Sequence, residues 1–132
     1  MAKRRMVKFD SKNPANEIAR MSAEEIDGLA FGAIEVDSKG TILRYNAAEG
    51  DISGRDPSQM IGKNFFREVA PCTDTEAFEG RFREGVESGH LDVALNYTFD
   101  YRMKPTQVRV RMQKTPHADD YWNTFWIFVK RL

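Results

Sequence analysis

The chain has 132 residues, a length that suits one domain with its own hydrophobic core. It carries 20 basic and 20 acidic residues, so its formal net charge is zero, and this excludes the basic excess that non-specific nucleic-acid binding requires. No apolar run approaches the roughly 20 residues of a membrane span. With one cysteine and no apolar signal segment after the basic start, we expect a cytoplasmic monomer that binds neither nucleic acid nor a membrane.

The first part of the chain is expected to form a small N-terminal unit. Residues 1–17 show weak periodicity and contain a turn signal. Ser22 and Glu25 fit a capping box, in which each side chain satisfies a backbone donor at a helix start, and Gly28 can end this short helix. We therefore assign residues 1–28 to an N-terminal cap and residues 29–132 to the core of a single domain.

Two strands and a turn-rich stretch follow. Residues 31–36 and 41–45 read as strands that a four-residue loop joins into a hairpin. Gly50 and Gly54 suggest tight backbone bends after the second strand. Asp56-Pro57 is a typical helix start, with a capping side chain and a proline just inside.

The next helix is predicted from Asp74 to Ser88. Phe78, Phe82 and Val86 recur at a spacing of four residues, so one face of this helix is apolar and should pack in the core. Gly89 is a plausible stop.

The last third of the chain returns to strand patterns. Residues 91–103 are rich in aromatic and β-branched side chains, and residues 104–106 form a turn. Alternation over residues 108–113 predicts a half-buried strand with a charged outer face. After a loop at 115–120, residues 124–130 form a final aromatic strand. This order predicts an α+β domain with an antiparallel sheet covered by helices on one face.

Cys72 is the only cysteine, so it cannot form an internal disulfide. One interpretation is a small buried apolar residue, which is usual for a free cysteine. The residue also lies just before a predicted helix, where the helix dipole favours a thiolate that could form a thioester with an activated acyl group. A thiol hydrolase would need a histidine base, but neither His90 nor His117 lies in a recognisable motif.

Tyr45 and Glu49 lie four residues apart, at the end of a predicted strand and in the connection after it. They are either an edge tyrosine with a solvated glutamate, or two buried donors that grip an oxyanion. Burial would keep the glutamate neutral, and a neutral carboxylic acid can donate a hydrogen bond and later a proton. Ser53 could orient Tyr45, or simply serve a turn. Arg55 could compensate a buried anion or cover a stacked ring, or pair on the surface with a neighbouring aspartate.

A further group of large side chains could wall an aromatic ligand, although most aromatic residues in so small a domain simply pack. The group consists of Phe65, Phe66, Tyr97, Phe99 and Met103.

Most of the chain, from about residue 26 to residue 132, resembles the photoactive yellow protein family. Six blocks in order carry the resemblance: Asp27–Ile34, Tyr45–Ile52, Ile61–Phe66, Val69–Asp74, Tyr97–Tyr101 and Phe128–Arg131. The resemblance implies a PAS fold, with a central antiparallel sheet flanked by helices and an N-terminal helical cap.

The resemblance further implies a blue-light photoreceptor with p-coumaric acid (4-hydroxycinnamic acid) bound as a thioester to Cys72. Tyr45 and Glu49 would bond the phenolate oxygen, and Arg55 would gate the pocket. The remaining contacts would come from Ser53, Phe65, Tyr97, Phe99 and Met103. Light would isomerise the chromophore from trans to cis, Glu49 would protonate the phenolate, and the buried charge left behind would open part of the domain. Such a receptor is not an enzyme, and it would act on a downstream signalling protein.

The chain departs from the family pattern in three places. Ser53 stands where the best-known members have threonine, so a hydroxyl is kept and a methyl is lost. The loop before the last strand is about four residues longer by eye and contains Trp122. The first 20 or so residues match poorly. The alternatives to a photoreceptor are a PAS-type small-molecule or redox sensor without a covalent pigment, and a structural interaction module.

Overall fold

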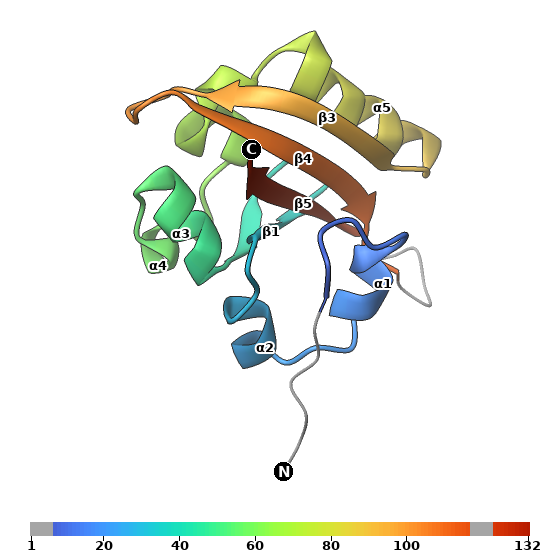
Figure 1. Ribbon diagram of the computed structural model, residues 1–132. Helices are drawn as coiled ribbons and strands as arrows, with labels where there is room; N and C mark the ends of the chain where they lie inside the picture. The colour runs from blue at the N-terminus through green and yellow to red at the C-terminus, as the bar shows by residue number, and fades with distance from the viewer. Residues whose placement is uncertain (1–6, 117–122) are drawn as a thin grey trace.

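A five-stranded antiparallel sheet organises the protein in a computed structural model that describes residues 7–116 and 123–132 (Figure 1). The strand order is β2-β1-β5-β4-β3, so the first strand of the chain pairs with the last. The strands are β1 (Gly32–Asp37), β2 (Ile42–Tyr45), β3 (Asp92–Phe99), β4 (Thr106–Lys114) and β5 (Thr124–Arg131).

The helices lie in two groups, one on each side of the sheet (Figure 1). The N-terminal group is α1 (Pro14–Ile18) and α2 (Ala23–Asp27). The group between β2 and β3 is α3 (Ala47–Ser53), α4 (Pro57–Met60), the π-helical turn η1 (Phe65–Val69), the 3-10 turn η2 (Pro71–Thr73), the π-helical turn η3 (Glu76–Gly80) and α5 (Arg81–Ser88).

Alternate side chains of β5 enter two separate hydrophobic cores. Phe125, Ile127 and Val129 pack into the core under α3, η1 and α5, while Trp126 and Phe128 pack into the core under the N-terminal segment. Both faces of this strand are therefore buried, which explains its continuous apolar run. The prediction that helices cover only one face of the sheet is wrong, because α1 and α2 cover the other.

The N-terminal segment is held more firmly than its weak periodicity indicates. Phe9, Ile18 and Met21 are among its buried anchors. Arg111 of β4 donates hydrogen bonds to backbone carbonyls of this segment, among them that of Phe9 at 2.8 Å. Gln113, the next residue on the same strand face, accepts from the backbone N–H of α1 at 3.1 Å. The predicted charged outer face of β4 is thus partly covered.

Two local predictions are also wrong. Gly50 was expected in a tight bend, but it lies inside α3, which Asn46 caps and Gly54 ends with a φ of 73°. The third strand ends at Phe99 rather than at Met103, and a turn follows.

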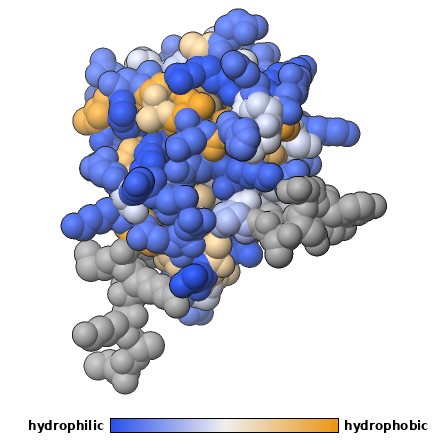
Figure 2. Space-filling view, turned by 90° about the vertical axis from the view of Figure 1, so that its right-hand side faces the viewer, coloured by the Kyte–Doolittle hydropathy of each residue, from blue (hydrophilic) through white to orange (hydrophobic). Residues whose placement is uncertain are grey.

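The capping box and both strands of the hairpin are confirmed, as are the starts of α4 and β5 and the stop at Gly89. His117 and Trp122 lie outside the described residues. In the part of the chain that the structure describes, no helix is both long and apolar enough to cross a membrane. Figure 2 shows one side of the molecule, where mainly hydrophilic side chains surround a smaller hydrophobic area.

Candidate functional site

The site is built around the start of α3, immediately after β2. Asn46 caps this helix by accepting from the backbone N–H of Glu49 at 3.1 Å. One helical turn separates Glu49 from Ser53, so both side chains lie on the buried face of α3, and Tyr45 precedes the helix at the end of β2. Glu49 lies in the connection after β2, as predicted, and this part of the connection is helical.

Tyr45 is held by a chain of hydrogen bonds. Its hydroxyl lies 2.7 Å from Ser53 Oγ, and Ser53 Oγ donates to the backbone carbonyl of Glu49 at 2.9 Å. A serine hydroxyl has one proton, so Tyr45 donates to Ser53 in this arrangement; when Ser53 turns its proton to the Tyr45 oxygen instead, the Tyr45 proton is available to a ligand, and the 2.7 Å bond allows either direction. Burial, followed by the neighbouring Glu49, raises the pKa of Tyr45 above its ordinary value and keeps the phenol protonated.

Glu49 is a buried carboxyl group with one unsatisfied oxygen atom. Its side chain is 1% exposed, and its Oε2 atom makes no hydrogen bond. Burial raises the pKa of Glu49 to about 8, although the charges of Arg131 and Arg55 oppose the shift. A Cβ atom on Gly32 would come within 2.6 Å of Oε2, so the bare backbone of β1 forms one wall of this site. At neutral pH the group holds a proton that it can donate.

Arg55 closes the site on another side. It donates to the backbone carbonyl of Val69 through Nε at 3.2 Å and Nη2 at 2.8 Å, and to that of Tyr101 at 3.0 Å. Its guanidinium also lies 5.7 Å from the centre of the Tyr101 ring. These contacts are with backbone carbonyls and a tyrosine ring, so the alternative interpretation of Arg55 as a surface residue paired with an aspartate is wrong.

Cys72 lies half-buried in η2. Its backbone carbonyl accepts a hydrogen bond from the Tyr97 hydroxyl, and Thr73 Oγ1 donates to the Ala70 carbonyl at 2.6 Å. These hydrogen bonds fix the backbone around Cys72, so the loop that carries the thiol has a defined conformation.

A small cavity joins these groups. Its volume is about 10 Å³, which is room for about one water molecule. The predicted residues that line it are Tyr45, Glu49, Ser53, Arg55, Phe65, Cys72, Phe99 and Met103. Sequence reasoning missed Val69, Ala70 and Tyr101, although the first two lie only three and two residues before Cys72.

Two predicted wall residues lie elsewhere. Tyr97 contacts the site through the Cys72 carbonyl rather than through the cavity lining. Phe66 lines a different hollow, between η1 and α5. Among the described residues, no group of three or more potential ligands is placed to hold a metal ion.

The donor set fits a phenolic anion. Two protonated acids, Tyr45 and Glu49, and the permanent cation Arg55 line one cavity, and hydrogen bonds from such donors to an anion are short and strong. The orphaned Oε2 atom of Glu49 has bonding capacity left for a ligand. Because the cavity is small, a ring-sized ligand requires its walls to move outward.

Comparisons with known proteins agree with this geometry. A family model described as the PAS fold matches residues 21–132. Photoactive yellow protein from Rhodothalassium salexigens is 54% identical over 127 residues, covering 96% of this chain and 98% of that protein. Photoactive yellow protein from Halochromatium salexigens is 53% identical with the same coverage.

A solved structure is similar as well. The photoactive yellow protein domain of the sensor histidine kinase Ppr from Rhodospirillum centenum has a TM-score of 0.78 at 49% identity, covering 86% of this chain and 96% of that one. The sequence blocks, the sheet and the cavity around the single thiol therefore have one explanation: the chain belongs to the photoactive yellow protein family of PAS-fold blue-light photoreceptors.

Proposed function

We propose that Cys72 carries p-coumaric acid as a thioester and that Tyr45 and Glu49 hold its phenolate oxygen. One observation supports this assignment above all: the lone thiol shares a cavity with a buried, protonated carboxyl group that has one unsatisfied oxygen atom. A buried acid without a partner is costly to keep, so its presence favours a role in binding a ligand. Ser53, Arg55, Phe65, Phe99 and Met103 complete the walls, and Tyr97 positions the Cys72 loop.

When bound, the chromophore supplies absorption of blue light and a double bond that can isomerise. Glu49 supplies the proton. Because the raised pKa keeps Glu49 neutral in the dark, loss of its proton after illumination leaves a carboxylate inside the protein. Such a charge costs several kcal/mol unless it is paired, and this cost is the driving force for a structural change. Light detection of this kind involves no substrate turnover, so the protein is not an enzyme.

The N-terminal cap, residues 1–28, is the segment we propose to respond, with residues 29–132 as the sensor core. Asn46 links the two, because its Nδ2 atom donates to the carbonyls of Ile26 at 3.0 Å and Phe31 at 3.1 Å. The same side chain caps the helix that carries Glu49. A charge formed at Glu49 therefore acts on α3. Asn46, which begins this helix, also binds the N-terminal cap, so a change in α3 can reach the cap.

The partner that reads this change is proposed to be a signalling protein in the cytoplasm, where the thiol of Cys72 stays reduced before attachment. We propose that the protein acts as a monomer.

Chromophore attachment can be tested directly. Activated p-coumaric acid should replace the thiol hydrogen of Cys72 with one coumaroyl group, release its leaving group and turn the protein yellow. Cys72→Ala should stay colourless and keep its intact mass. Equal colour in this variant would contradict the thioester, and a wild-type protein that gains neither mass nor colour would favour a PAS sensor without a covalent pigment.

A further inference from the structure

Arg131 lies at the end of β5, outside the cavity of the candidate site, and yet its charge acts on Glu49. Burial raises the pKa of Glu49 to about 8, and two cations oppose this shift, Arg131 more strongly than Arg55. Arg55 lines the cavity and is already part of the site. The cation on β5 therefore needs its own explanation.

The register of the sheet places Arg131 beside the Glu49 carboxyl group. A Cβ atom on Gly32 would come within 2.6 Å of Glu49 Oε2, and Gly32 pairs with Val129 of β5. Arg131 follows Val129 by two residues, so both side chains point to the face of the sheet that α3 covers. The Arg131 backbone thus lies about 7 Å further along β5 and one strand spacing, about 5 Å, away from β1. An arginine side chain is long enough to cover most of this distance.

The sheet is narrower at this corner, which leaves room for the side chain. Gly32 is the first residue of β1, whereas β5 continues to Arg131, which pairs with Val108 of β4. The backbone N–H of Leu132 donates to the Gln107 carbonyl at 3.0 Å and holds this end of β5 in place. The Arg131 backbone is therefore fixed, and its side chain extends past the start of β1 towards α3.

One hydrogen bond attaches the Arg131 side chain to α3 within the described part of the chain. Its Nη2 atom donates to the backbone carbonyl of Asp51 at 3.0 Å. Asp51 lies in the last turn of α3, two residues after Glu49, where helix carbonyls lack partners within the helix and the helix dipole favours a cation. The guanidinium is thereby held near Glu49 without forming an ion pair with it.

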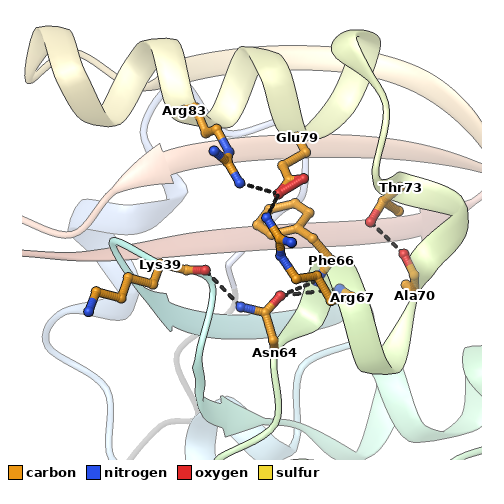
Figure 3. A network of polar contacts seen from close by, with 8 residues as sticks. All are labelled: Lys39, Asn64, Phe66, Arg67, Ala70, Thr73, Glu79 and Arg83. Carbon is orange, nitrogen blue, oxygen red and sulfur yellow. Dashed lines mark hydrogen bonds and ion pairs between the residues drawn. The ribbon is translucent and has the colours of Figure 1, made fainter.

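Among the described residues, no ion pair compensates the charge of Arg131. The arginines around Glu79 are different, because Arg67 and Arg83 lie 3.8 Å and 2.9 Å from the same carboxylate oxygen (Figure 3). The Asp51 carbonyl that Arg131 binds is neutral. Arg131 can therefore turn to a new anion without breaking an ion pair.

Arg55 is less suited to pair with a new anion. It makes three hydrogen bonds to the backbone carbonyls of Val69 and Tyr101, which would be left without their donor if it moved to Glu49. Arg131 would give up one bond to an exposed carbonyl, and water can replace that bond.

We propose that Arg131 is the counter-ion of the Glu49 carboxylate that forms after illumination, and that its guanidinium turns from the Asp51 carbonyl to this carboxylate. The inference rests on the proposed photoreceptor function, because it concerns the state in which Glu49 has lost its proton. An unpaired carboxylate inside a protein is costly, and a cation that reaches it lowers the cost. Arg131 therefore prolongs the illuminated state, since Glu49 must regain its proton before the dark state returns.

The pairing can be tested before a chromophore is attached, because alkaline pH produces the same carboxylate. Carboxyl-carbon NMR of the full chain follows the titration of each glutamate, and the signal missing in Glu49→Gln identifies Glu49. Arg131→Gln keeps a donor for the Asp51 carbonyl but removes the charge, so the pKa of Glu49 should rise by at least about half a unit, or about threefold in acidity. Arg131→Lys should leave this pKa closer to the wild-type value. Lys130→Gln, on the opposite face of β5, should leave it unchanged.

The role after illumination is tested with the chromophore-loaded protein. Arg131→Gln should recover its dark absorption at least about threefold faster than the wild type at the same pH, and Arg131→Lys should recover at nearly the wild-type rate. An unchanged Glu49 pKa in Arg131→Gln, or an equal rise in Lys130→Gln, would overturn the pairing. A raised pKa with unchanged recovery would overturn the role as counter-ion after illumination. A chain that takes up no chromophore would refute the proposed function, while the titration would still decide whether Arg131 pairs with Glu49.

Discussion

Neutralisation of Glu49 by burial predicts how the stability of the protein without chromophore depends on pH. The folded state holds the Glu49 proton up to about pH 8, whereas the unfolded chain releases it near the ordinary value of 4.5. The folded state therefore binds more protons between these values, so stability must fall as pH rises through this window. The Glu49 contribution is fully present below pH 4.5 and lost as pH rises through about 8.

The size of the effect follows from the width of the window. Each pH unit in which only the unfolded chain has lost the proton costs about 1.4 kcal/mol, so the full window corresponds to a ceiling of about 5 kcal/mol. Relaxation of the site or entry of water would lower this value. A typical domain is stable by about 5–15 kcal/mol, so even half of the ceiling is easily measured.

The assay is urea unfolding of the wild type and of Glu49→Gln at pH 5 and pH 9. Glutamine keeps the size of the side chain but does not titrate, so the difference in unfolding free energy between the two proteins isolates Glu49. From pH 5 to pH 9 the wild type should lose about 2–4 kcal/mol relative to the variant, because the assay covers about three of the pH units in the window. The exposed Glu24→Gln substitution controls for the loss of one carboxyl group. A wild-type to Glu49→Gln difference that changes by less than about 0.5 kcal/mol would refute the reasoning.

Three further substitutions test the surroundings of the site. Ser53→Val removes the hydrogen-bond partner of the Tyr45 hydroxyl and should shift the absorption of the loaded protein, while Ser53→Thr should shift it less. Identical spectra would place Ser53 outside the site. Gly32→Ala puts a methyl group within 2.6 Å of the buried carboxyl oxygen and should lower the free energy of unfolding in urea by about 1–3 kcal/mol. Gly28→Ala, with no contact closer than 3.6 Å, should lower it clearly less. Equal losses would contradict the close approach of β1 to Glu49. Arg111→Gln removes the bonds to the N-terminal carbonyls and should raise amide hydrogen exchange over residues 7–28 more than over β3; unchanged exchange would show that this side chain does not hold the segment.

Local signals in the sequence predicted local structure well. The capping box at Ser22 and the proline after Asp56 each place a helix start correctly, because the deciding contacts lie within four residues. Gly50 misled the prediction for the opposite reason. A Cβ atom there would meet the Arg55 carbonyl and the Pro57 ring, both at 2.9 Å, so this glycine serves close packing inside a helix rather than a bend.

The residue types of the site were predictable from the sequence, but the long-range hydrogen bonds that close it were not. Resemblance to the family brought Cys72, Tyr45 and Glu49 together, and the structure places all three on one cavity. No sequence pattern showed that Arg55 binds the carbonyl of Tyr101, 46 residues away, or that Arg111 binds the carbonyl of Phe9, 102 residues away. Contacts of this kind depend on the completed sheet and leave no short-range periodicity.

The most direct test of the account is the infrared difference spectrum of the chromophore-loaded protein between light and dark. Illumination should remove the absorption of a protonated carboxylic acid and produce a carboxylate band, and both signals should be absent in Glu49→Gln. If the wild-type spectrum shows no loss of a protonated carboxyl, or if Glu49→Gln shows the same loss, Glu49 is not the proton source and the proposed switch is wrong.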